Sequence, residues 1–218
     1  MTNRFPGVRV LIFDLDGTLV DSKLDLAHSV NAMLTEFQRP VLPHETIYSY
    51  VGNGAPMLVR RALGENASET ECETGLHYFL DYYREHMLDN TITYPGVREA
   101  LEQLACNPMA VLTNKPVRFS EEILKGLGIA RYFRCVYGGN SFETKKPHPL
   151  GVEIILSELK AQPTEAMMVG DSDVDVRTAR NSGIWSCGVS YGLGMESMRQ
   201  HPPDIMLDTL ADLPAYLA

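Results

Sequence analysis

The sequence has little of what marks a secreted, zinc-binding or membrane protein. Its four cysteines are far apart and form no CxxC pair, so neither a zinc cluster nor a disulfide framework is indicated. No apolar run approaches the length of a membrane span, and the N-terminal run is too short, and too soon interrupted by acids, for a signal peptide. We therefore expect a cytoplasmic protein with buried free thiols and no membrane partner.

Positive charge is also scarce. Lys and Arg number 19 against 28 Asp and Glu, which gives a formal net charge of −9. Such a chain repels a polyanionic duplex, so nucleic acid is not expected as a partner. A small anionic substrate stays compatible with this charge, because a few basic side chains or a metal ion at one site can outweigh the distant surface.

What the chain does contain is typical of one globular core. The 218 residues are 44% hydrophobic and 22% charged. Short apolar runs predict strands at Val8–Phe13, Met109–Leu112, Cys135–Tyr137, Ala166–Val169 and Trp185–Val189. Helical spacing connects them at Gly96–Ala105, Arg118–Leu127, Leu150–Leu159 and Val174–Asn181. This alternation predicts an α/β fold with a doubly wound, Rossmann-like parallel sheet.

One long interval breaks the alternation. Between about Ser22 and Thr93 apolar residues recur at helical spacing and no strand run is evident, so we expect it to be wholly helical. The turn Tyr94-Pro95-Gly96 marks the return to strands. We expect a core formed by residues 1–20 and 94–218, with an all-helical insertion at 21–93.

Polar residues stand at the ends of the predicted strands or on the loops that follow them. They are Asp14, Asp16, Thr18, Thr113, Asn114, Lys145, Lys146, Asp171, Ser172, Asp173 and Asp175. Ligands of open parallel sheets bind outside the carboxyl ends of the strands, so we expect these side chains to form one site. Several carboxylates at one edge repel one another unless a cation neutralises them, and oxygen ligands without His or Cys favour Mg²⁺.

Acids, a lysine and magnesium together indicate chemistry on phosphate. Asp14, screened by the metal ion and by a lysine, Lys145 or Lys146, is placed to attack phosphorus and form an aspartyl-phosphate. Asp16 can protonate the leaving oxygen and later deprotonate the attacking water. Thr113 and Asn114 offer a hydroxyl and amide N–H groups to the non-bridging oxygens.

Four motifs occur in order along the chain: DLDGTL at Asp14–Leu19, LTN at Leu112–Asn114, KP at Lys146–Pro147 and GDSDVD at Gly170–Asp175. In this set the sequence resembles the haloacid dehalogenase superfamily of aspartate-based phosphohydrolases, within it the phosphoglycolate phosphatase-like branch. The resemblance implies a helical cap inserted after the first motif. It also implies Mg²⁺ held by the Asp14 carboxylate, the Asp16 carbonyl and Asp171, with Asp175 supporting the site.

The substrate is expected from the same branch, because VGNGAP and KKPHP resemble it: 2-phosphoglycolate or a similar small phosphorylated metabolite. In the cap, the backbone at Gly52 and Asn53 could approach this substrate while Arg60 pairs with its carboxylate. The alternative for these three residues is a helix-joining turn and a charged helix face.

Two other functions remain open. A phosphosugar mutase of the same family would share every core residue and differ in how long the aspartyl-phosphate survives. A receiver-like, phosphate-sensing domain also carries an Asp at a strand end beside acids and a Lys, although the cap and Asp16 argue against it.

Overall fold

The computed structural model describes residues 5–217. The core is a six-stranded sheet in the order β5-β4-β1-β6-β7-β8, with every neighbouring pair parallel. The strands are β1 (Val10–Phe13), β4 (Met109–Leu112), β5 (Phe133–Tyr137), β6 (Ala166–Gly170), β7 (Trp185–Val189) and β8 (Ile205–Leu207). The predicted α/β fold is confirmed.

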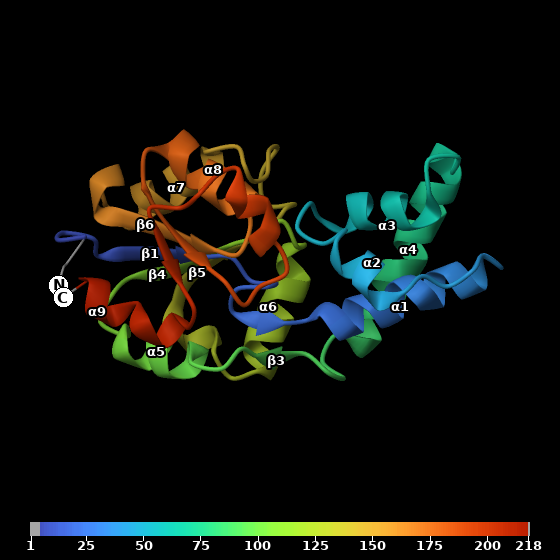
Figure 1. Ribbon diagram of the computed structural model, residues 1–218, viewed down its shortest axis with the longest axis horizontal. Coiled ribbons are helices and arrows are strands. Elements are labelled where there is room, and N and C mark those ends of the chain that lie inside the picture. Colours follow the sequence, from blue (N-terminus) through green and yellow to red (C-terminus); the bar gives the residue numbers. More distant parts are fainter. Residues whose placement is uncertain (1–4, 218) are drawn as a thin grey trace.

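Helices cover both faces of this sheet (Figure 1). In β1, Leu11 and Phe13 pack into one apolar cluster while Val10 and Ile12 pack into another on the opposite face. Helices α5 (Val97–Gln103) and α6 (Val117–Gly126) contribute to the first cluster, and α7 (Leu150–Glu158) and α8 (Asp173–Ser182) to the second. Burial on both faces explains why the strands read as continuous apolar runs.

Four helices form a separate group at one end of the molecule (Figure 1). They are α1 (Lys23–Glu36), α2 (His44–Tyr48), α3 (Ala55–Leu63) and α4 (Glu69–His86). Helix α4 begins with a capping box between Ser68 and Glu71. A Cβ at Gly75 would come within 3.1 Å of both Leu63 and Met33, so this glycine lets α4 pack closely on α1 and α3.

One detail differs from the expected all-helical interval. Strand β3 (Ile92–Thr93) pairs antiparallel with β2 (Val20–Asp21), where the chain leaves and re-enters the core. Strands of two residues are too short to show a period, so the sequence pattern does not reveal them. Nearby, the buried Asp25 carboxylate accepts hydrogen bonds from the backbone and side chains of Asn90 and Thr91.

The chain ends with α9 (Pro214–Leu217). Short 3-10 turns lie at Ala130–Tyr132, Pro163–Glu165, Met195–Arg199 and Leu210–Asp212. None of the helices between residues 5 and 217 combines the length and the apolar character that crossing a bilayer requires.

Candidate active site

The central strands bring three polar side chains to one edge of the sheet. Asp14 follows β1, Thr113 follows β4 and Asp171 follows β6, and β1 lies between the other two strands. All three residues are buried. Folds of this kind bind ligands in the crevice at the carboxyl ends of adjacent parallel strands, and the sequence predicts a site at this edge.

Three carboxylates gather around one lysine. Oxygen atoms of Asp14, Asp171 and Asp175 lie within 4.8 Å of one another. Lys146 Nζ lies 2.8 Å from Asp14 Oδ1 and 2.6 Å from Asp175 Oδ1. All four residues are buried, so the group holds more negative than positive charge away from solvent.

Backbone groups hold two of these acids in place. Asp175 Oδ2 accepts hydrogen bonds from the Ser172 amide and hydroxyl in a capping box that opens α8. Asp171 Oδ2 accepts from the amides of Leu193 and Gly194, at 2.7 and 2.9 Å. At Gly17, where φ is +84°, a Cβ would lie 2.3 Å from Asp171 Oδ2, so only glycine lets the turn after Asp16 approach this closely.

The pKa values of the cluster reflect its charge. Burial raises the pKa of Asp14, the Lys146 ammonium opposes this rise, and the Asp175 carboxylate adds to it. Burial also raises the pKa of Asp171, and the charges of Asp175 and Asp14 raise it further. A bound cation would reduce the repulsion among these carboxylates and favour their ionised forms.

A divalent metal ion fits this donor set. The three side chains offer only carboxylate oxygens, the ligands that Mg²⁺ prefers, and two positive charges would balance the surplus left by Lys146. The Asp16 carboxylate is not part of the cluster.

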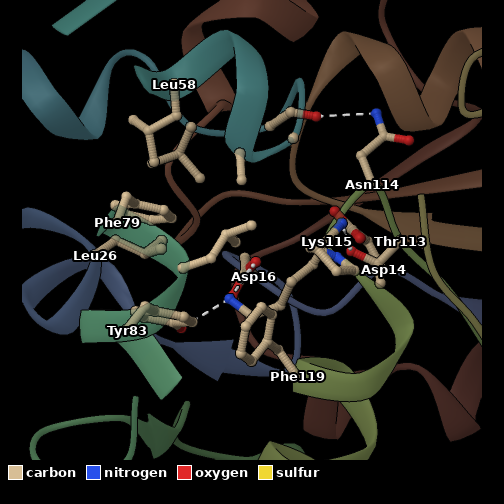
Figure 2. A pocket seen from close by; sticks show the side chains of 16 residues that line it. Asp14, Asp16, Leu26, Leu58, Phe79, Tyr83, Thr113, Asn114, Lys115 and Phe119 are labelled. Atoms are coloured by element: carbon tan, nitrogen blue, oxygen red, sulfur yellow. Dashed lines mark hydrogen bonds and ion pairs between the residues drawn. The ribbon is translucent and has the colours of Figure 1, made fainter. Parts of the chain in front are cut away.

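The Asp16 carboxylate contacts a different set of residues, which does not include the acidic cluster. The Ser22 hydroxyl donates a 2.5 Å hydrogen bond to Asp16 Oδ1, and Lys115 Nζ lies 3.1 Å from both carboxylate oxygens. Lys115 also donates to the Tyr83 hydroxyl of α4 at 2.7 Å (Figure 2). Burial alone would lower the pKa of Lys115, but Asp16 and Tyr83 raise it above its ordinary value. Neither Lys115 nor Tyr83 is among the site residues that the sequence predicts.

The loop at 51–54 contacts the core through two polar side chains. Asn114 Nδ2 donates to the carbonyls of Gly52 and Lys146, and Lys145 Nζ donates to the carbonyl of Asn53. A Cβ at Gly54 would stand 3.0 Å from the Asn114 carbonyl oxygen. The loop therefore lies directly over the strand ends.

A small cavity of about 50 Å³ lies between this loop, α4 and the strand ends (Figure 2). Of the residues expected from the sequence, it is lined by Asp14, Asp16, Gly52, Thr113 and Asn114. Lys146, Asp171 and Asp175 are in the acidic cluster that includes Asp14 and do not line the cavity.

Two expected cap residues lie elsewhere. Asn53 does not line the cavity, and its carbonyl accepts a hydrogen bond from Lys145. Arg60 pairs with Glu69 on the surface and lines a different depression with Arg61 and Tyr50. Contrary to the expectation, Arg60 is therefore not among the residues around the cavity, because it projects from the exposed face of α3.

The chain belongs to a known protein family. The family model described as haloacid dehalogenase-like hydrolase matches residues 11–189. The phosphoglycolate phosphatases of Pseudomonas syringae pv. syringae and Vibrio parahaemolyticus are each 38% identical to this chain, over 213 and 215 residues. These alignments cover 94% of the chain and 78% and 94% of the two relatives.

A solved structure is similar over its whole length. The crystal structure of a predicted phosphoglycolate phosphatase from Haemophilus somnus matches with a TM-score of 0.90 and 32% identity, covering 96% of this chain and 98% of that one.

Proposed function

The chain is a phosphatase of the haloacid dehalogenase-like hydrolase family, and we propose that it hydrolyses a short phosphomonoester through an aspartyl-phosphate on Asp14. The observation that carries this mechanism is the position of Asp14. Its carboxylate faces a small cavity, and its Oδ1 lies 2.8 Å from the buried Lys146 ammonium.

In the first step, a carboxylate oxygen of Asp14 forms a bond to phosphorus as the ester P–O bond breaks. Lys146 holds the Asp14 carboxylate in one orientation and supplies positive charge next to the phosphoryl group. The Thr113 hydroxyl and the Asn114 backbone are next to Asp14 at the strand ends and bind the non-bridging oxygens.

Asp16 moves the proton. It donates a proton to the leaving oxygen, and in the second step it takes one from the water that attacks the aspartyl-phosphate and releases inorganic phosphate. Its carboxylate lines the same cavity as Asp14 and is held by Ser22 and Lys115.

We propose Mg²⁺ as the cation, held by the carboxylates of Asp14 and Asp171 and the carbonyl of Asp16, with Asp175 supporting them. When bound, it neutralises charge on the phosphoryl oxygens. Asp175 acts in part through Lys146, which it holds at 2.6 Å.

The proposed substrate is 2-phosphoglycolate or a similar small phosphorylated metabolite. Two observations support a small substrate: relatives at 38% identity are named phosphoglycolate phosphatases, and the cavity measures only about 50 Å³. A cavity of about 10–15 Å³ holds a single water. The cavity next to Asp14 therefore leaves room for only a few atoms beyond the phosphate. Gly52 and Asn53 belong to the loop that covers it.

We further propose that residues 1–20 and 94–218 form the catalytic core and residues 21–93 the cap. The antiparallel pair β2–β3 at the two crossings supports this division. In it the core supplies the chemistry, while the cap excludes water and adds apolar walls around the leaving group.

The decisive experiment measures inorganic phosphate released from 2-phosphoglycolate by the purified protein in Mg²⁺ and in EDTA. We expect steady release in Mg²⁺ and none in EDTA. A glucose phosphate offered in parallel tests for a mutase, which would yield an isomeric sugar phosphate without free phosphate. A receiver-like domain would retain one phosphoryl group per chain and turn over no substrate.

A further inference from the structure

The cavity next to Asp14 has apolar walls and one positive charge. Its apolar lining includes Leu26, Leu58, Phe79, Leu80 and Phe119. Among the described residues around it, Lys115 is the one basic side chain. Lys115 is buried and paired with Asp16, and burial of such an ion pair beside leucine and phenylalanine side chains is costly, so the pair calls for a function.

The contacts of Lys115 place its ammonium group at the boundary between core and cap. Lys115 directly precedes Pro116 and α6, and its Nζ reaches Tyr83 of α4, 4.4 Å from the ring centroid (Figure 2). The Tyr83 hydroxyl accepts one of its hydrogen bonds at 2.7 Å, and Asp16 accepts the others.

Positioning of Asp16 does not by itself require this lysine. The Ser22 hydroxyl already donates to Asp16 Oδ1 at 2.5 Å. Lys115 also lines the cavity, whereas a residue that only positioned Asp16 could lie behind the carboxylate. Because Ser22 also holds Asp16, an N–H group of Lys115 can turn from Asp16 to a ligand that enters the cavity.

The other basic groups near the strand ends do not line the cavity. Lys146 is held between Asp14 and Asp175, and Lys145 donates to the carbonyl of Asn53. Arg60 pairs with Glu69 outside the cavity. A second negative group on the substrate would find its counter-charge at Lys115.

We propose that Lys115 is the specificity-determining residue of this site and binds a carboxylate on the carbon chain of the substrate. The inference rests on the proposed phosphatase function. It defines the substrate class as short phosphorylated acids, because a compact anion pairs with the ammonium group while its carbon contacts the apolar walls. A sugar would bring several hydroxyls against those walls without hydrogen-bond partners.

The test compares two substrates of nearly equal size in the intact protein with Mg²⁺. 2-Phosphoglycolate carries the carboxylate, and 2-hydroxyethyl phosphate carries a hydroxyl in its place. In Lys115→Gln, the ratio of kcat/KM for the first substrate over the second should fall by about 30-fold, which corresponds to about 2 kcal/mol. Lys125→Gln, at an exposed position near the end of α6, is the matched control and should leave the ratio unchanged.

A second variant separates charge from shape. Lys115→Arg keeps the positive charge and should retain the preference for 2-phosphoglycolate within a few-fold, whatever it does to kcat. If Lys115→Gln does not fold, the substrate preference of Lys115→Arg tests the proposal in its place. If arginine loses the preference completely, or if Lys115→Gln slows both substrates equally, Lys115 does not bind the carboxylate.

The wild type distinguishes failure of this inference from failure of the proposed function. Equal kcat/KM for both substrates would leave a working phosphatase and overturn the role of Lys115. Absence of phosphate release from either substrate, and from p-nitrophenyl phosphate, would overturn the phosphatase itself.

Discussion

The ammonium group of Lys146 lies 2.8 Å from the carboxylate of Asp14, and both are buried at the end of the central strand β1. The pair gives the proposed nucleophile a fixed orientation and a neighbouring positive charge. Because Asp14 supplies the nucleophile and Lys146 the positive charge, substitutions of the two should reduce activity for different reasons.

Replacement of Asp14 should remove the covalent step. Asp14→Asn keeps the size of the side chain but replaces the nucleophilic oxygen, so turnover should fall by at least about a thousandfold. Brief reaction with 2-phosphoglycolate followed by acid quench and mass spectrometry should detect no phosphorylated chain. A normal steady-state rate in this variant would rule out Asp14 as the nucleophile.

Replacement of Asp16 should instead slow proton transfer. Asp16→Asn removes the acid and base, an effect that usually costs about 100- to 10,000-fold. Because Asp14 is intact, the same mass measurement should find a phosphorylated chain that persists. If the variant loses both turnover and the phosphorylated chain, Asp16 acts only in the formation of the aspartyl-phosphate and not in its hydrolysis.

Removal of the Lys146 charge should affect both activity and stability. Lys146→Gln should lower kcat/KM by about 100- to 1,000-fold, the range found when one transition-state donor is lost. It also leaves Asp14 and Asp175 without their buried partner, so the melting temperature should fall in EDTA. Lys125→Gln, at an exposed position, serves as the control; equal effects of the two substitutions would contradict the assignment.

The acidic cluster should couple stability to pH and metal. Burial raises the pKa of Asp14 to about 6 and that of Asp171 to about 7, above an unfolded value of about 4. The metal-free folded protein thus binds more protons than the unfolded chain between about pH 4 and 7, and its free energy of unfolding should fall as pH rises through this window.

Magnesium should reverse that loss, because it replaces the protons on the same oxygens. Thermal unfolding in EDTA and in Mg²⁺ should show a larger Mg²⁺-induced rise in Tm at about pH 7.5 than at about pH 5. Asp171→Asn should reduce the difference, whereas Asp173→Asn, outside the cluster, should preserve it. An equal rise at both pH values would argue against metal binding by these acids.

The carboxylate of Asp25 should be important for stability rather than chemistry. It is buried and accepts four hydrogen bonds from Asn90 and Thr91. Asp25→Ala should lower the free energy of unfolding by about 2–4 kcal/mol, because several donors lose their acceptor at once. Denaturant titration would measure this loss against Asp89→Ala, an exposed control. A loss no larger than that of the control would contradict the role.

The strand-end residues could be predicted because apolar runs mark where the strands end, and their alternation with helices indicates a parallel sheet. Asp14, Thr113 and Asp171 each follow an apolar run, and adjacent parallel strands end at a common edge. Their proximity follows from topology alone, before any side-chain contact is known.

Lys115 could not be predicted in this way. It directly follows the LTN motif, but its partners Asp16 and Tyr83 are 99 and 32 residues away in sequence. Helical spacing likewise does not say which side of α3 faces the site: Leu58 lines the cavity, whereas Arg60 points to solvent. Only the packing of α3 and α4 over the strand ends decides these contacts.

The pairing of β2 with β3 brings together the two ends of the stretch that carries α1 to α4. Asp21 and Ile92 are direct antiparallel partners, although 70 residues separate them in the sequence. A tight turn could join these two positions and leave the order of the six parallel strands intact. Exchange of the intervening residues would replace the apolar cavity walls contributed by Leu26, Leu58 and Phe79, while Asp14 and Lys115 would stay beside the parallel strands.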